Sequence, residues 1–139
     1  MVSGMFAQNK PIYDSILAKK LGADDYGMKH YVFCILKTGP ATITDNAKKD
    51  SLFAGHMKNI ERLANEGKLA VAGPFGKNDK QYRGIFIFNV GTIVEAEKLV
   101  QSDPAVKAGI FVAELTEWYA SAALMATPEM HKKLQKKGF

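Results

Sequence analysis

The chain has 139 residues, of which 47% are hydrophobic and 24% are charged, with a net charge of +5. This is the composition of one ordinary globular domain. No run of ~18 apolar residues occurs, so we predict no membrane-spanning segment and no membrane partner. The single cysteine, Cys34, excludes an intramolecular disulfide and a cysteine-rich metal site, and we predict that it is a small buried hydrophobe.

The two ends of the chain lie outside the predicted core. Residues 1–8 lack the basic and apolar regions of an intact signal peptide. Residues 5–8 are either the end of a trimmed secretion signal or a remnant of expression, and a cytoplasmic location is the default expectation. Residues 131–137 are rich in lysine, but arginine is scarce and aromatic residues do not alternate with basic ones. We therefore expect a solvated basic tail and no nucleic-acid partner.

The hydrophobic pattern predicts helices and strands along the whole chain. In chain order these are a helix over 11–21, a strand over 29–37, a helix from 45 or 50 to 66, strands over 68–75 and 82–90, a helix over 92–101, a strand over 109–119 and a last helix over 128–137. The core order is β-α-β-β-α-β, which predicts an α+β, ferredoxin-like fold with two helices on one face of an antiparallel sheet. We divide the chain into an N-terminal extension (1–28), the ferredoxin-like domain (29–120) and a C-terminal basic helix (121–139).

Two of the predicted strands are apolar on both faces. In the strand over 29–37, positions 31, 33 and 35 share one face and positions 32, 34 and 36 share the other, and all six are aromatic, aliphatic or cysteine. The two core helices cover only one face of such a sheet, and a large exposed apolar face is unusual on a soluble monomer. We therefore predict a homodimer that packs sheet against sheet across a two-fold axis. The short terminal helices are the alternative cover for this face.

His56 is a polar residue where the helical pattern expects an apolar one. It shares a stripe of the predicted helix with Leu52, Ile60 and Leu63, so its ring faces the core and needs a hydrogen-bond partner. The partner is either a backbone carbonyl or water, as in a structural core histidine, or another residue of an active site. The preceding residue, Gly55, weakens the helix by about 1 kcal/mol relative to alanine and lets another segment approach closely.

Asp103 is the candidate partner of His56, although an aspartate before Pro104 is also typical of a helix N-terminus. A histidine that is hydrogen-bonded to a carboxylate suits general acid-base catalysis near neutral pH. No nucleophile motif and no metal-ligand spacing accompanies the pair, so we expect neither a metal nor a cofactor. Haem or flavin binding is the weaker alternative. We also consider that Arg83 binds a carboxylate or phenolate and that Gly73 and Pro74 leave space beside the sheet.

An ordered series of short motifs resembles the YCII-related domain family over about residues 29–120. The motifs are GHM at 55–57, LANEGKL at 63–69, AGPF at 72–75, RGIFIF at 83–88, SDPAVKAG at 102–109 and EWY at 117–119. The resemblance implies a dimeric α+β barrel with an active-site His–Asp pair, here His56 and Asp103. A dehydrochlorinase of a chlorinated hydroxyquinol and the muconolactone isomerases share this fold.

We therefore expect a small cofactor-independent enzyme of the lyase or isomerase type. His56 would transfer a proton during elimination or isomerisation of a cyclic or aromatic small molecule, and Asp103 would orient it. Arg83, Gly73 and Pro74 would help to line the pocket. The alternative is a non-enzymatic module that binds or senses a small ligand in the same cavity.

Overall fold

The computed structural model describes residues 10–139, so the predicted signal remnant at 5–8 lies outside the described residues. The helices and strands, in chain order, are α1 (Ser15–Leu21), β1 (Met28–Thr38), α2 (Asn46–Asn65), β2 (Leu69–Pro74), β3 (Tyr82–Phe88), α3 (Ile93–Val100), α4 (Pro104–Lys107), β4 (Phe111–Ser121), η1 (Ala122–Ala126) and α5 (Thr127–Leu134). No helix among residues 10–139 is long and apolar enough to cross a bilayer.

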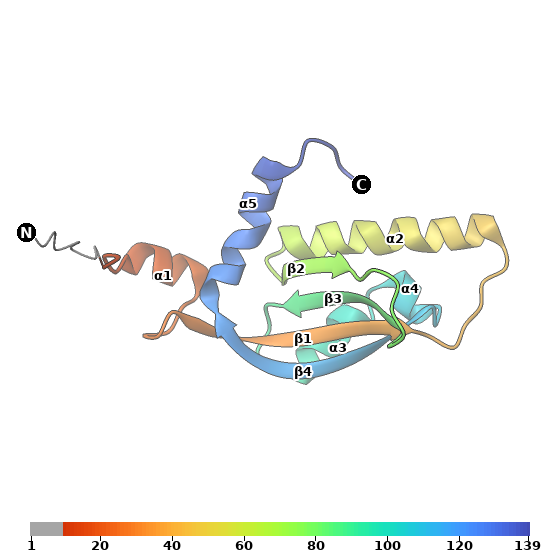
Figure 1. Cartoon of the computed structure of the whole chain (residues 1–139), viewed down its shortest axis with the longest axis horizontal. Coiled ribbons are helices and arrows are strands. Elements are labelled where there is room, and N and C mark those ends of the chain that lie inside the picture. Colours follow the sequence, from red (N-terminus) through yellow and green to blue (C-terminus); the bar gives the residue numbers. More distant parts are fainter. Residues whose placement is uncertain (1–9) are drawn as a thin grey trace, which may run out of the picture.

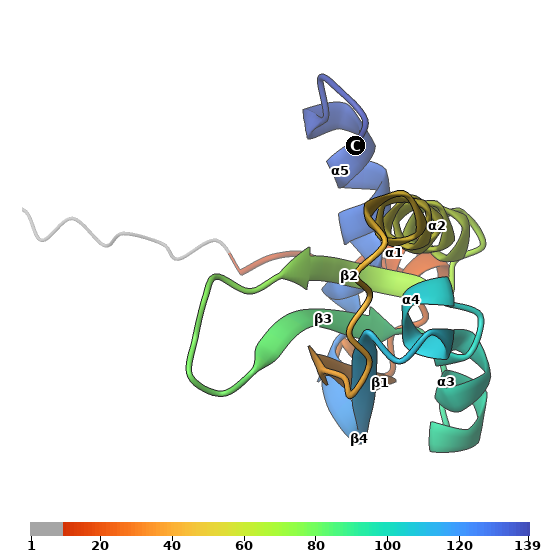
Figure 2. The ribbon, with the colours of Figure 1, turned by 90° about the vertical axis from the view of Figure 1, so that its right-hand side faces the viewer.

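The four strands form one antiparallel sheet in the order β2-β3-β1-β4. This is the ferredoxin-like arrangement, and it confirms the α+β fold that the sequence predicts. Helix α2 runs along the sheet in Figure 1, and the view turned by 90° in Figure 2 shows α2, α4 and α3 on one side of the strands. The other side has no core helix, and we call it the open face.

Several boundaries differ from the sequence prediction. Helix α1 starts at Ser15 and not at residue 11, because the Asp14 side chain accepts hydrogen bonds from the backbone N–H groups of Ile16 and Leu17 and so caps the helix there. Helix α5 ends at Leu134, before the last two lysines. The 3₁₀-helix η1 between β4 and α5 is an element that the sequence pattern does not predict.

The main core lies between the helices and the covered face of the sheet. Residues of β1, β3 and β4 that share this face are buried against α2 and α3; they are Val32, Cys34, Leu36, Phe86, Phe88 and Phe111, with Leu63 and Val100 from the helices. Cys34 is fully buried and free, as the sequence predicts. Such a layer excludes water from any polar group placed in it.

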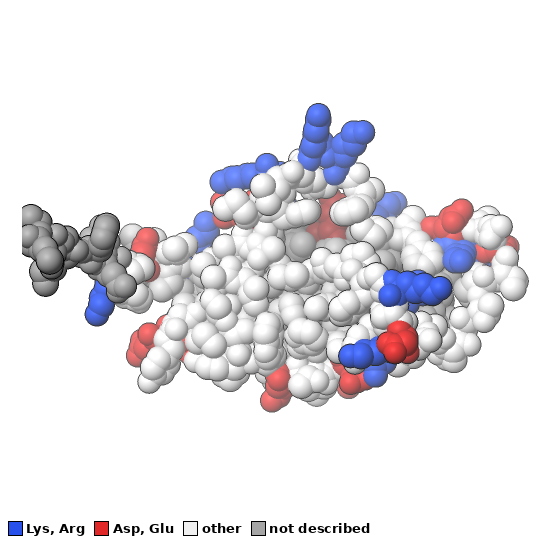
Figure 3. Space-filling view, viewed as in Figure 1, with Lys and Arg blue, Asp and Glu red and all other residues white. Residues whose placement is uncertain are grey.

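The open face is apolar and only partly covered. At one end, Leu124 and Met125 of η1 pack on a second cluster that includes Tyr31 and Ile87. Toward the other end, Val112 of β4 is 48% exposed. Figure 3 looks onto this face and shows a broad area without charged side chains over the strands, with charged groups at its edges.

Candidate functional site

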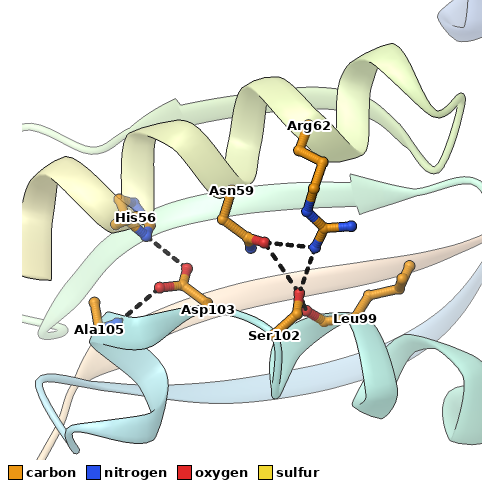
Figure 4. Close-up of polar contacts among 7 residues, drawn as sticks. All are labelled: His56, Asn59, Arg62, Leu99, Ser102, Asp103 and Ala105. Carbon is orange, nitrogen blue, oxygen red and sulfur yellow. Dashed lines mark hydrogen bonds and ion pairs between the residues drawn. The ribbon is translucent and has the colours of Figure 1, made fainter.

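His56 and Asp103 form a hydrogen-bonded pair between α2 and the segment that precedes α4. His56 Nδ1 lies 2.6 Å from Asp103 Oδ2, and Figure 4 shows the two side chains pointing toward each other. The Asp103 side chain is fully buried and that of His56 is 13% exposed. Because a carboxylate only accepts hydrogen bonds, Nδ1–H donates, and in the neutral ring the other nitrogen, Nε2, carries the free lone pair.

The local sequence positions Asp103 by making it the N-cap of α4. Its Oδ1 accepts the backbone N–H of Ala105 at 2.9 Å, while Oδ2 remains for His56. Pro104 occupies the first helical position, where its missing N–H costs nothing. The capping role and the partnership with His56 therefore coexist, because they use different oxygens of one carboxylate.

Gly55 allows α2 to approach α4 closely enough for this contact. A Cβ atom at position 55 would lie 2.7 Å from Pro104 Cγ, which is closer than van der Waals contact allows. The glycine that weakens the helix therefore lets Pro104 pack directly on the helix backbone. One residue further along α2, His56 is brought within hydrogen-bond distance of Asp103.

The rest of the His56 ring lies among aromatic side chains. Its centroid is 5.3 Å from that of Phe111 and 6.0 Å from that of Phe86. No described residue makes a hydrogen bond to Nε2, and the ring keeps a small exposed area. The pair thus has one nitrogen held by a buried carboxylate and one nitrogen free for a ligand.

The negative charge of Asp103 also acts on the nearby thiol of Cys34. Burial, and then the repulsion of a thiolate by Asp103, raise the pKa of Cys34 to about 12. A thiol with this pKa is not ionised near neutral pH and is a poor nucleophile. Cys34 is therefore unsuited to act as a nucleophile in this site.

A second polar group joins α2 to the segment that carries Asp103. Asn59 is only 7% exposed, and its Oδ1 accepts hydrogen bonds from Arg62 Nη2 at 2.8 Å and Ser102 Oγ at 3.1 Å. Arg62 Nη2 also donates to Ser102 Oγ, and Figure 4 shows this cluster one turn along from His56. Asn59 Nδ2 is buried without a partner among the described residues. The cluster fixes the position of Ser102, the residue before Asp103.

A pocket of about 210 Å³ lies next to the His–Asp pair. The residues that line it are Thr38, Ala41, Thr42, Ile43, Lys49, Phe53, Arg83, Ile110 and Phe111. His56 is not a lining residue, but Phe111 contacts both the pocket and the His56 ring, and Phe53 packs edge-on against Phe111. Phe53 and Phe111 therefore form an aromatic wall between the pocket and the His–Asp pair.

The wall formed by residues 39–43 is held in place by backbone contacts. Gly39 N–H donates to Ile110 O at 2.7 Å, and Ala41 N–H donates to Gly109 O at 3.0 Å. A Cβ atom at Gly39 would lie 2.1 Å from Gly109 O, so only glycine fits this close approach. These contacts hold residues 39–43 in place as one wall of the pocket.

Only some of the site residues that the sequence suggests lie together in the structure. His56 and Asp103 are in contact, and Arg83 lines the adjacent pocket. Gly73 and Pro74 lie in β2 opposite Ile85 and Gly84 and are not lining residues of this pocket. Sequence reasoning missed Asn59, Ser102 and Lys49 as neighbours of the site. The signal for Asn59 was its place three residues after His56 on the same helix face.

No group of three His, Cys, Asp or Glu side chains in the described part of the chain is arranged to hold a metal ion. The two other histidines lie elsewhere. His30 packs against Tyr119 in the sheet, and His131 lies in α5.

Comparisons with known proteins place the chain in a family. Among solved structures, the 5-chloro-2-hydroxyhydroquinone dehydrochlorinase of Burkholderia phenoliruptrix AC1100, in complex with 2,5-dihydroxybenzoquinone, is 26% identical; the match covers 63% of this chain and 92% of that chain, with a TM-score of 0.43. Comparison with curated proteins finds no match. The model of the YCII-related domain matches residues 30–119, which is more than half of the chain. The chain therefore belongs to the YCII-related domain family.

Proposed function

We propose that the protein is a small enzyme that moves a proton on a cyclic or aromatic substrate, with His56 as the general base and acid. The observation that carries this proposal is the 2.6 Å contact between His56 Nδ1 and the fully buried Asp103 carboxylate. A carboxylate in this position fixes the tautomer of the ring and stabilises its protonated form. Neither an isomerisation nor an elimination transfers electrons to or from an external partner, so the proposed chemistry uses no redox group.

The proposed reaction begins when His56 Nε2 removes a proton from an acidic C–H bond of the substrate. In an isomerisation, the imidazolium returns this proton to a different carbon, and the double bond shifts. In an elimination, the electron pair of the C–H bond forms the new double bond, the leaving group departs as an anion, and the proton passes to water. Asp103 supports either course by pairing with the imidazolium that forms after the first step.

We also propose that the functional unit is a homodimer that pairs through the open face. The support is the broad uncharged area over the strands and the exposure of Val112 and Trp118 on that face. The 3₁₀-helix η1 covers only one end of the face, so an apolar area remains for a second copy. Lys37 and Glu114 form an ion pair at the edge of this area.

The proton-transfer proposal is tested by hydrogen–deuterium exchange at carbon. The protein is incubated in D₂O with a panel of γ-lactones and of di- and trihydroxybenzenes, and ¹H NMR follows the loss of carbon-bound protons. An enzyme that removes a proton exchanges it with solvent even when no net product forms. We expect His56→Gln to slow this exchange by on the order of 10²–10⁴-fold.

His30→Gln is the matched control, because His30 is an exposed histidine of β1 outside the site. It should exchange substrate protons at the wild-type rate. Equal rates for the wild type and His56→Gln would contradict the proposal. Binding of panel compounds without exchange or turnover of any of them would favour the alternative of a ligand-binding module.

A further inference from the structure

We infer that the pocket beside the His–Asp pair selects negatively charged single-ring substrates, and that Lys49 and Arg83 hold the charge. The inference rests on the proposed function, since it names the substrate class of the same site. Lys49 and Arg83 line the pocket from two different elements, α2 and β3. Neither forms an ion pair with any residue in the described range 10–139.

The backbone around Arg83 turns its side chain toward the pocket. A register shift between Leu36 and Lys37 places Tyr82 opposite Lys37 instead of Arg83, which is the mark of a β-bulge. Tyr82 then lies beside Lys37, whose amine is 5.6 Å from the centre of the Tyr82 ring. Arg83 therefore has no partner residue in β1, and its side chain lines the pocket. Without this shift, strict alternation would put Arg83 on the open face with Ile85.

A strained residue accompanies the bulge. Gln81 has a φ of +61°, a left-handed conformation that is uncommon for residues other than glycine. Its carbonyl accepts the backbone N–H of Thr38 at 3.0 Å, and Thr38 itself lines the pocket. Strain of this kind persists where the surrounding structure holds it, and such positions cluster at ligand sites. The β-bulge and the left-handed Gln81 together direct the Arg83 guanidinium toward the pocket.

Lys49 lies on the same side of α2 as the reacting histidine. Lys49, Phe53 and His56 follow one another at i, i+4 and i+7, which places them along one stripe of the helix. The helical rise separates Lys49 from His56 by about 10 Å along the axis. A ligand whose charged group is held by Lys49 and Arg83 thus extends along the aromatic wall in the direction of His56.

The size and lining of the pocket restrict the rest of the ligand. Its volume of about 210 Å³ exceeds the ~150 Å³ of a cavity that takes up benzene, and is below the ~300 Å³ at which pockets for drug-sized ligands begin. Five lining residues are apolar, and two of these are the phenylalanines of the aromatic wall. The pocket therefore fits one substituted ring, with a carboxylate or phenolate at the cationic end.

Benzoate and benzamide are the probes, because they have the same shape and differ in charge. Each is titrated into ¹⁵N-labelled full-length protein, and the backbone amide shifts of residues 38–43, 110 and 111 are followed. We expect these amides to respond to benzoate with at least tenfold higher affinity than to benzamide. Arg83→Met and Lys49→Met should each weaken benzoate binding by roughly tenfold to a hundredfold. Higher salt should weaken it further in the wild type.

Lys48→Met and Lys80→Met are the matched controls. Lys48 is the neighbour of Lys49 on α2, Lys80 lies in the β2–β3 connection near Arg83, and neither lines the pocket. Both variants should bind benzoate as the wild type does. Equal affinities for benzoate and benzamide would overturn the inference, as would unchanged benzoate binding in Arg83→Met. Shifts confined to α5, which does not line this pocket, would also overturn it, because benzoate would then bind elsewhere.

His56→Gln separates this inference from the proposed function. It should bind benzoate normally, since His56 does not line the pocket. Benzoate binding that depends on Arg83, together with no His56-dependent exchange on any compound, would refute the enzyme and leave the anion site standing. His56-dependent exchange without charge-selective binding in the pocket would refute the anion site alone.

Discussion

The two faces of the four-stranded sheet present similar apolar strands to different surroundings. The covered face packs against α2 and α3, and it carries a buried carboxylate paired with a histidine. The open face carries a second apolar cluster that η1 covers at one end, and its ion pair, Lys37–Glu114, is partly exposed at the edge. A charged group on the covered face is held away from water by the chain's own helices, whereas charges on the open face stay solvated.

The covered face is suited to a buried polar site, and the open face is suited to contact with a partner. The buried Asp103 carboxylate is stable because both of its oxygens have partners, His56 on α2 and the backbone N–H of Ala105 on α4. The open face offers apolar area without such partners, which suits association with a second copy. Substitutions on each face test this division.

The carboxylate of the covered face is tested by Asp103→Asn. The asparagine oxygen still accepts the N–H of Ala105, so α4 keeps its cap, but a neutral amide does not stabilise the imidazolium of His56. We expect the rate of substrate proton exchange to fall by on the order of 10²–10⁴-fold. Asp24→Asn, which removes an exposed carboxylate bonded to Tyr119, should leave the rate unchanged. A wild-type rate for Asp103→Asn would remove Asp103 from the mechanism.

The open face is tested by Val112→Lys. Val112 is exposed in the single chain, so lysine is tolerated there, but in a sheet-to-sheet dimer it would bury a second positive charge beside Lys37, its neighbour on β1. We expect light scattering to give twice the mass of one chain for the wild type and the mass of one chain for Val112→Lys. Val94→Lys is the control, because Val94 is 61% exposed on α3 and lies away from the open face. A dimeric Val112→Lys or a monomeric wild type would contradict pairing through this face.

The close approach of α2 and α4 is tested by Gly55→Ala. Alanine normally stabilises a helix by about 1 kcal/mol relative to glycine. Here the added methyl group meets Pro104, so we expect the free energy of unfolding to fall by about 1–3 kcal/mol in urea titrations. Gly91→Ala is the control, since a Cβ atom there meets nothing within 4 Å. An increase in stability for Gly55→Ala would show that the contact with Pro104 relaxes easily.

The raised pKa of Cys34 has no effect on stability near neutral pH, because the thiol is then protonated in both the folded and the unfolded protein. The pKa of this thiol is about 12 in the folded protein and ~8.5 in an unfolded chain. The unfolded state therefore loses its proton first, and the contribution to stability that is full below pH ~8.5 declines as the pH rises toward 12. Urea titrations between pH 8 and 10.5 should show a steeper loss of stability for the wild type than for Cys34→Ala. Equal slopes would contradict the raised pKa.

Much of the fold could be predicted from the sequence, because it depends on local periodicity. The alternation in β1 and the helical stripe of α2 gave the order β-α-β-β-α-β, and both faces of β1 were correctly predicted to be apolar. The partial cover by η1 was not predicted. It depends on how the chain turns after Ser121, and no periodic pattern marks a five-residue 3₁₀-helix.

The candidate site was less accessible to sequence reasoning. His56 stood out as a polar ring on an apolar stripe, but its 2.6 Å contact with Asp103 joins residues 47 positions apart and follows from no local pattern. The family resemblance suggested this pair. The pocket role of Arg83 depends on a β-bulge, and that of Lys49 depends on the path of residues 39–43. Registers and close approaches of this kind are properties of tertiary packing.

The most direct test of the account is the tautomer of His56, measured by long-range ¹H–¹⁵N NMR of the imidazole rings at a pH where this ring is neutral. Assignment uses the loss of one ring in His56→Gln. We predict that Nδ1 carries the proton and that Nε2 shows the shift of an unprotonated nitrogen, and that this preference is lost in Asp103→Asn. A neutral His56 protonated on Nε2, or a tautomer that Asp103→Asn does not alter, would contradict the claim that Asp103 prepares His56 as a base.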